Sequence, residues 1–138
     1  MKTECLELYA KNIIESKLEG VSFEGIYFKK PGARCNEGTY VFNYKNKYHI
    51  LYCEKGKRYE GISTSSLDEL LWELIDIISF PLAMQYATKE KNGSEDYRKK
   101  LFEKEIEYFR LFSQKYKEKK INQINEILNK NPYKDICT

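Results

Sequence analysis

The sequence predicts an α+β domain: an N-terminal helix, a four-stranded antiparallel β-meander, and a C-terminal bundle of three to four helices packed on the sheet. Three observations predict it. The hydrophobic period is helical near the start, changes to runs of Val, Ile, Phe and Tyr over residues 21–63, and becomes helical again after Ser63. Strands and helices are thus segregated along the chain, as in α+β proteins. The 138 residues suit one domain, 1–138, with a core of its own.

The first helix is expected over residues 3–18, because Leu6, Tyr9 and Ile13 recur at helical spacing, and Gly20 ends it. A longer loop opens at Lys30, and short polar breaks mark two tight hairpin turns. The expected strands are 22–29, 38–44, 48–54 and 58–63, with turns at Lys45–Lys47 and Lys55–Gly56.

A three-residue turn at 45–47 and a two-residue turn at 55–56 would place many aromatic residues on one sheet face. That expected ladder is Tyr40, Phe42, Tyr44, Tyr48, Ile50, Tyr52 and Tyr59. Cross-strand pairs of this kind contribute about 0.2–1 kcal/mol each. The opposite face would carry Val41, Leu51 and Cys53 with Asn43 and His49. The favoured interpretation is that helices cover the ladder as core.

The C-terminal half begins with a capping box, Ser66 followed by Glu69, that opens a helix reaching about residue 91. This helix is apolar on most of its circumference, which indicates a central position. Pro81 is expected to kink or split it. Ser94 is expected to cap the next helix and Ser113 the last one, and periodicity leaves open whether 94–129 is one bent helix or two.

Composition limits the chemistry. The chain has 12 Tyr but a single histidine, His49, which excludes a two-histidine metal site and leaves little material for histidine-dependent catalysis. The net charge of +3 is too small to indicate a nucleic-acid partner. Glycine-rich phosphate loops are absent from the sequence, and carboxylate pairs lie at helix starts or on polar faces. We therefore expect a protein that is not an enzyme and needs no cofactor or metal.

The four cysteines, at positions 5, 35, 53 and 137, include no CxxC pair and follow no secretory signal. No apolar stretch approaches the roughly 18 residues of a membrane helix. These patterns predict a cytoplasmic protein with reduced, mostly structural thiols and no membrane association. His49 is interpreted as a half-buried, hydrogen-bonded side chain in mid-strand.

The residues alone leave two specific functions open. A small enzyme that inactivates a toxin or metabolite would need a deep pocket holding His49 beside a carboxylate. An RNA-binding module would need the aromatic ladder to be exposed, although four consecutive strands do not match the strand order of RNA-recognition folds.

Several short motifs, in order, resemble a known family. They are EKGKRYE at 54–60, SLDELLWELI at 66–75, Ala83 with Tyr86, DYRKKLFEKEIEYF at 96–109 and EILNKNPYKD at 126–135. Together they resemble the immunity-63 family of immunity proteins from bacterial polymorphic-toxin systems of the contact-dependent inhibition type. The resemblance covers roughly residues 38–135, and Pro81 is a departure from it.

The resemblance implies a protein that binds the C-terminal domain of its cognate toxin in the cytoplasm and blocks it. It does not locate the contact surface. We predict that surface at the charged hairpin tip, formed by Glu54, Lys55, Lys57, Arg58, Tyr59 and Glu60. Tyrosine and arginine are favoured anchors of protein interfaces, which is the reason for this choice.

Overall fold

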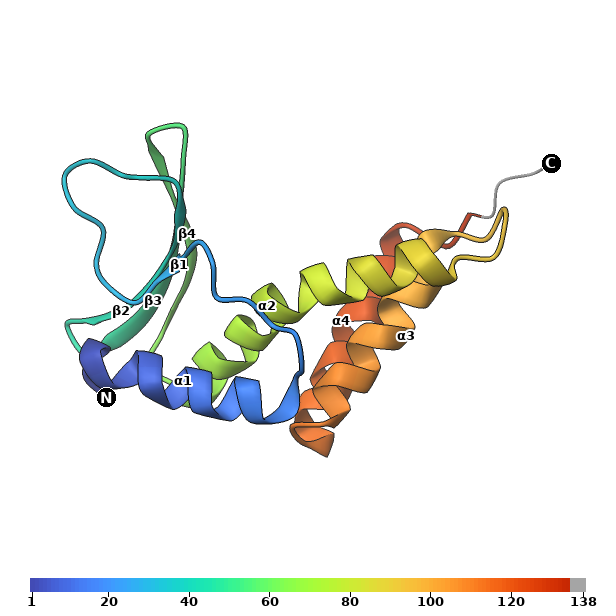
Figure 1. The fold of residues 1–138 in the computed structure, drawn as a ribbon, viewed down its shortest axis with the longest axis horizontal. Coiled ribbons are helices and arrows are strands. Elements are labelled where there is room, and N and C mark those ends of the chain that lie inside the picture. Colours follow the sequence, from blue (N-terminus) through green and yellow to red (C-terminus); the bar gives the residue numbers. More distant parts are fainter. Residues whose placement is uncertain (135–138) are drawn as a thin grey trace. The chain divides into compact units, whose positions relative to one another are not determined.

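The computed structural model describes residues 1–134 and has the predicted α+β order of elements (Figure 1). The elements are α1 (Thr3–Lys17), β1 (Ile26–Tyr27), β2 (Gly38–Tyr44), β3 (Lys47–Glu54), β4 (Lys57–Thr64), α2 (Leu67–Glu90), α3 (Tyr97–Arg110) and α4 (Gln114–Lys130). The chain divides into two compact units. The sheet unit comprises Met1–Ser16 and Ser22–Leu74, and the helical unit comprises Lys17–Val21 and the chain from Ile75 onward.

The first strand departs from the predicted meander. The strand expected over 22–29 is reduced to the two residues of β1, which pair with β2 in parallel. The sheet order is β1-β2-β3-β4, so the sheet is mixed and only its last three strands form an antiparallel meander. The physical reason is the long loop between Tyr27 and Gly38, which returns the chain so that β2 starts beside β1 in the same direction. The sequence marks that loop but not its direction.

The hairpin between β2 and β3 turns in two residues rather than three. Tyr44 pairs with Lys47, and both turn residues, Lys45 and Asn46, have positive φ (53° and 62°). This conformation is typical of a type I′ turn, which usually carries Asn-Gly rather than Lys-Asn. The predicted pairing was therefore wrong by one residue, and a one-residue shift exchanges the faces of a strand.

The single aromatic ladder consequently does not form. Tyr40, Phe42 and Tyr44 share a face with His49, Leu51 and Cys53, whereas Tyr48, Ile50, Tyr52 and Tyr59 lie on the opposite face. The predicted pairing of Tyr52 with Tyr59 is confirmed. Because Tyr40 and Tyr48 are buried on different faces, the RNA-binding alternative loses the continuous exposed aromatic surface that it needs.

Hydrogen bonds tie α1 to the sheet within the sheet unit. The Thr3 hydroxyl accepts a hydrogen bond from the backbone N–H of Asn43 at 3.0 Å, and the N-terminal ammonium of Met1 donates to the Tyr48 hydroxyl at 2.7 Å. These bonds hold the start of α1 at the end of the sheet where the β2–β3 hairpin turns (Figure 1). The buried side chains of this unit include Leu6, Ala10, Ile14, Val41, Ile50, Leu70 and Leu74.

The start of α2 confirms part of the predicted capping box. The Ser66 hydroxyl accepts from the backbone N–H of Glu69 at 3.1 Å. The Glu69 carboxylate, however, accepts from the Thr64 hydroxyl at 2.9 Å, and the Ser66 N–H donates to that same hydroxyl at 3.0 Å. Thr64 thus replaces half of the reciprocal bonding that a capping box has.

Pro81 does not split α2, which runs unbroken over 24 residues. Phe80 and Pro81 are both exposed, so the proline ring lies on the solvent side, where water can satisfy backbone groups. Among residues 1–134, α2 is the one helix long and apolar enough to cross a membrane by length and composition. This is weak evidence for a membrane, because half of its most apolar window is buried and a core helix has the same composition.

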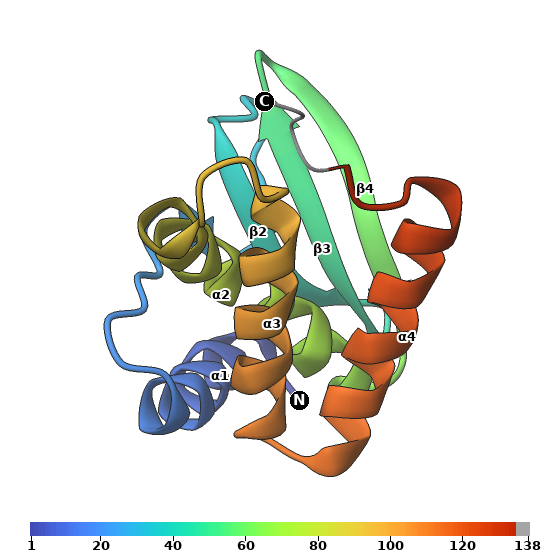
Figure 2. The ribbon, with the colours of Figure 1, turned by 90° about the vertical axis from the view of Figure 1, so that its right-hand side faces the viewer.

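Residues 94–129 form two helices, α3 and α4, which lie side by side (Figure 2). The predicted cap at Ser113 is confirmed, because its hydroxyl accepts from the backbone N–H of Tyr116 at 3.1 Å. The predicted cap at Ser94 is wrong, since Asp96 caps α3. A cluster of buried side chains from α2, α3 and α4 forms the core of this unit: Ala83, Ala87, Leu101, Phe102 and Ile124.

Candidate partner-binding surface

The predicted contact residues occupy the tip of the β3–β4 hairpin, and all six are exposed. Lys55 and Gly56 form the expected two-residue turn, with φ of 51° and 76°. Arg58 pairs with Cys53 and Tyr59 pairs with Tyr52, so these two neighbours point to opposite faces of the sheet. The structure therefore brings the six residues to one tip but divides their side chains between its two sides.

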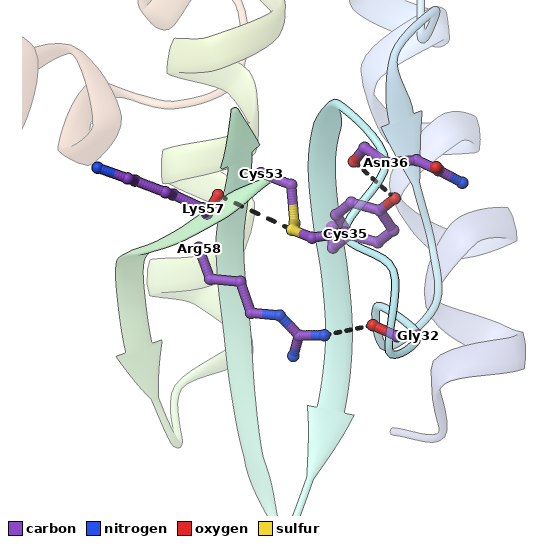
Figure 3. The surroundings of a disulfide bond; sticks show 7 residues. Gly32, Cys35, Asn36, Cys53, Lys57 and Arg58 are labelled. Atoms are coloured by element: carbon purple, nitrogen blue, oxygen red, sulfur yellow. Dashed lines mark hydrogen bonds between the residues drawn. A yellow bond between two sulfur atoms is a disulfide. The ribbon is translucent and has the colours of Figure 1, made fainter. Parts of the chain in front are cut away.

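A loop covers the side of the sheet that carries Arg58. Cys35 forms a disulfide with Cys53, with the Cα atoms 5.7 Å apart. The Arg58 guanidinium donates a hydrogen bond to the Gly32 carbonyl, and the Tyr40 hydroxyl donates to the Asn36 carbonyl at 2.9 Å (Figure 3). The Cys35 sulfur also lies 3.8 Å from the Lys57 carbonyl oxygen, but a disulfide sulfur carries no hydrogen to donate. Three strands thus hold the loop against the sheet.

The predicted reduced state is wrong for Cys35 and Cys53, which form a disulfide. Spacing alone could not show the pairing, because Cys35 and Cys53 are 18 residues apart. The pairing register of β2 and β3 explains the disulfide. Gly38 pairs with Cys53, and this brings the residues just before β2 beside the end of β3. Cys5 is free and exposed, and Cys137 lies outside the described residues.

His49 lies on the same face and is half-buried and hydrogen-bonded, as predicted. Its ring stacks on Phe42 with 5.1 Å between ring centroids, and its Nδ1 lies 3.3 Å from a carboxylate oxygen of Glu60. The side chain of His49 is 19% exposed and that of Glu60 is 53% exposed. This contact fixes the orientation of the ring at the sheet surface and uses one of the predicted contact residues, Glu60, for an intramolecular bond.

Two lysines lie over the ring of the exposed Tyr44 at the other end of the sheet unit, a feature that sequence reasoning missed. The Lys30 ammonium lies 3.7 Å from the centre of the Tyr44 ring, and that of Lys45 lies 5.2 Å from it. Residues 22–60 contain eight Lys and Arg but four Asp and Glu. The sheet and its loops therefore present a positive surface, and lysines next to tyrosines in the sequence were the available signal.

In the helical unit the ion pair between Arg98 and Asp96 stabilises the fold. Arg98 donates to both carboxylate oxygens of Asp96, and this hydrogen bonding holds the pKa of Asp96 well below its ordinary value. The same guanidinium donates to the carbonyls of Asn131 and Pro132, each at 2.8 Å. The cluster thus ties the segment after α4 to the start of α3. Within residues 1–134, no three His, Cys, Asp or Glu side chains gather as metal ligands.

The fold is thus that of a small α+β protein with an exposed, charged hairpin and a loop tied to the same sheet by a disulfide. The sequence model of the family Immunity protein 63 matches residues 44–126, which is more than half of the chain. The chain therefore belongs to the Immunity protein 63 family, as the resemblance predicted. The match includes the hairpin tip and Cys53 and begins after the loop that carries Cys35. Searches of curated proteins and of solved structures gave no significant match.

Proposed function

We propose that this protein binds the toxic C-terminal domain of a cognate bacterial polymorphic toxin in the cytoplasm and neutralises it by occlusion. Membership in the Immunity protein 63 family carries the proposal, because an immunity protein implies a toxin partner. Occlusion requires only a stable interface, and about 800 Å² buried on each partner is typical of one. No catalytic group of the immunity protein has a role in this mechanism.

The hairpin tip and the tethered loop form the proposed contact surface. Tyr59 is 49% exposed, which gives it the area to act as an anchor. Arg58 is held by Gly32 on the loop side, so the tip is organised before binding, and less conformational entropy is lost when a partner docks. The excess of basic residues in this part of the chain suits a partner with an acidic surface.

The proposed cytoplasmic location affects what the disulfide between Cys35 and Cys53 can contribute to the loop. The cytoplasm keeps most thiols reduced, so the loop must also stay in place without the bond between Cys35 and Cys53. Two hydrogen bonds remain for this, from Arg58 to Gly32 and from Tyr40 to Asn36. We therefore propose that the reduced form binds the toxin as well as the oxidised form does.

The test uses the C-terminal domain of the protein encoded by the open reading frame immediately upstream, which is where we expect the toxin gene. Co-expression with this protein should restore bacterial growth, and calorimetry on the purified proteins should show a complex. Failure of both would reject the proposed function. The double variant Arg58→Ala/Tyr59→Ala should lower the affinity by about tenfold or more. Arg110→Ala/Leu111→Ala is the matched control, because it removes an exposed arginine and an exposed apolar neighbour from the helical unit.

The outcome for the hairpin is separate from the outcome for the function. If the wild-type protein neutralises the toxin and the Arg58/Tyr59 double variant binds as tightly as the control, the hairpin tip is not the contact surface. The function would then stand and only its location would be wrong.

A further inference from the structure

We propose that a cavity in the helical unit, between α2, α3 and α4, receives a cationic side chain, arginine or lysine, from the partner protein. The cavity has a volume of about 210 Å³. The lining residues that bear on its chemistry are Asp76, Phe80, Glu105, Lys120, Gln123 and Ile127. The inference rests on the proposed function for the existence of a protein partner, and it adds a second contact for that partner in the helical unit.

The floor of the cavity holds an excess of negative charge. Lys120 and Glu105 are each 3% exposed, and the ammonium of Lys120 lies 2.5 Å from a Glu105 carboxylate oxygen. The same ammonium lies 2.6 Å from an Asp76 carboxylate oxygen and 2.7 Å from the amide oxygen of Gln123. One positive charge therefore faces two carboxylates, and its three N–H donors have three oxygen acceptors.

Both charged neighbours affect the buried Glu105 carboxylate. Burial raises the pKa of Glu105, and the nearby Asp76 carboxylate adds to the rise, while Lys120 opposes it. The side chain of Asp76 is 25% exposed, so this carboxylate is the one that an incoming group can reach. A second cation placed beside Asp76 would balance the cluster.

The walls of the cavity suit the long stem of a basic side chain. Phe80 is 47% exposed and Ile127 is 40% exposed, so two large apolar side chains line the opening. Arginine and lysine cover apolar surface with their methylene groups and keep the charged end near polar atoms. A cation over an aromatic ring such as that of Phe80 gains further attraction. At about 30 Å³ per water molecule, the cavity has room for several waters or for one such side chain.

The charges of the cavity and of the segment beside it select for a single basic side chain. The chain as a whole has a net charge of +3, and the segment from Lys115 to Lys119, just before the cavity residue Lys120, carries three lysines and one glutamate. A negative cavity in such surroundings attracts a single cation while the surface around it repels a broadly basic partner. The occupant is therefore one basic side chain rather than a basic patch.

The first experiment measures the affinity of the upstream-encoded toxin domain for two variants, Phe80→Ala and Asp76→Asn, by calorimetry. Both should bind about tenfold or more weakly than the wild type. The matched controls are Leu111→Ala, which removes an equally exposed apolar side chain, and Glu118→Gln, which neutralises an exposed carboxylate on α4. Circular dichroism establishes that each variant is folded. If the wild type neutralises the toxin and both cavity variants bind as tightly as their controls, the cavity is not an anchor site.

A second experiment does not depend on the toxin. N-acetyl-arginine amide and its neutral isostere N-acetyl-citrulline amide are titrated into the full chain, and backbone amide signals are followed by NMR. Saturable shifts at Asp76, Phe80 and Ile127 with the arginine compound alone, lost in Asp76→Asn, would support the site. Equal shifts with both compounds, or none, would overturn it. If the wild type binds no toxin, the proposed function fails and this titration alone decides the cavity.

Discussion

Removing the buried ammonium of Lys120 tests how the helical unit tolerates charge in its interior. In Lys120→Met a side chain of similar length fills the space, but Glu105 loses its partner at 2.5 Å and stays buried. Asp76 is partly exposed, so water can replace most of what it loses. We therefore expect the cost to come mainly from Glu105.

The expected loss is about 3–5 kcal/mol in the free energy of unfolding near neutral pH, the usual cost of breaking a buried ion pair from one side. The cost should depend on pH. Burial already raises the pKa of Glu105 above its ordinary value of 4.5, and without Lys120, which lowers it, this pKa rises further. Below 4.5 the carboxyl is protonated in both the folded and the unfolded chain, so the penalty disappears. As pH increases above that value, the unfolded chain ionises first and the folded state loses stability relative to it.

Urea unfolding followed by circular dichroism at about pH 4 and about pH 7.5 measures both effects. Lys130→Met is the matched control, because Lys130 is exposed on the same helix and its loss should change stability by less than about 0.5 kcal/mol. The double variant Lys120→Met/Glu105→Leu should recover most of the loss, since an apolar pair of similar volume often replaces a buried ion pair without cost. A penalty that is equal at both pH values, or that the double variant does not reduce, would refute the reasoning.

Three further variants test other parts of the structure. Cys53→Ser should lower the stability of the oxidised protein by about 3 kcal/mol, as for the loss of a bond closing a loop of this length, and should have little effect under reducing conditions, as measured by urea unfolding. Gly61→Ala should cost about 1–3 kcal/mol, because its Cβ would lie 2.6 Å from the Tyr52 ring; thermal unfolding with and without the substitution measures this. Ser79→Ala should be neutral or should stabilise the chain by about 1 kcal/mol, since among the described residues the buried Ser79 hydroxyl has no hydrogen-bond partner; a rise or no change in the urea midpoint is the expected result.

The sequence correctly predicted several features that depend on interactions between residues close together in the chain. The two-residue turn at Lys55 and Gly56, the cap at Ser113 and the pairing of Tyr52 with Tyr59 are confirmed. The turn between β2 and β3 was missed because Lys45 and Asn46 both adopt positive φ without a glycine. That single residue of register changed which tyrosines share a face.

The candidate sites likewise contain one part that the sequence predicts and others that only the tertiary structure brings together. The charged hairpin tip from Glu54 to Glu60 could be predicted from its residues, and its contact with a partner stays a prediction. The loop over the sheet could not, because the bond between Cys35 and Cys53 joins residues 18 apart through the register of the sheet. The cluster of Asp76, Glu105 and Lys120 likewise comes from three helices, and each residue alone looks like an ordinary charge on a helix.

The sequence by itself determined the α+β order, the family and the limit that a single histidine places on chemistry. These depend on composition, on periodicity and on motifs in order, all of which are local. Only the tertiary structure decided the direction of β1, the two faces of the sheet, the disulfide and the buried charges. Each of these depends on contacts between residues distant in the chain, whose free energy belongs to the packed arrangement and not to any one segment.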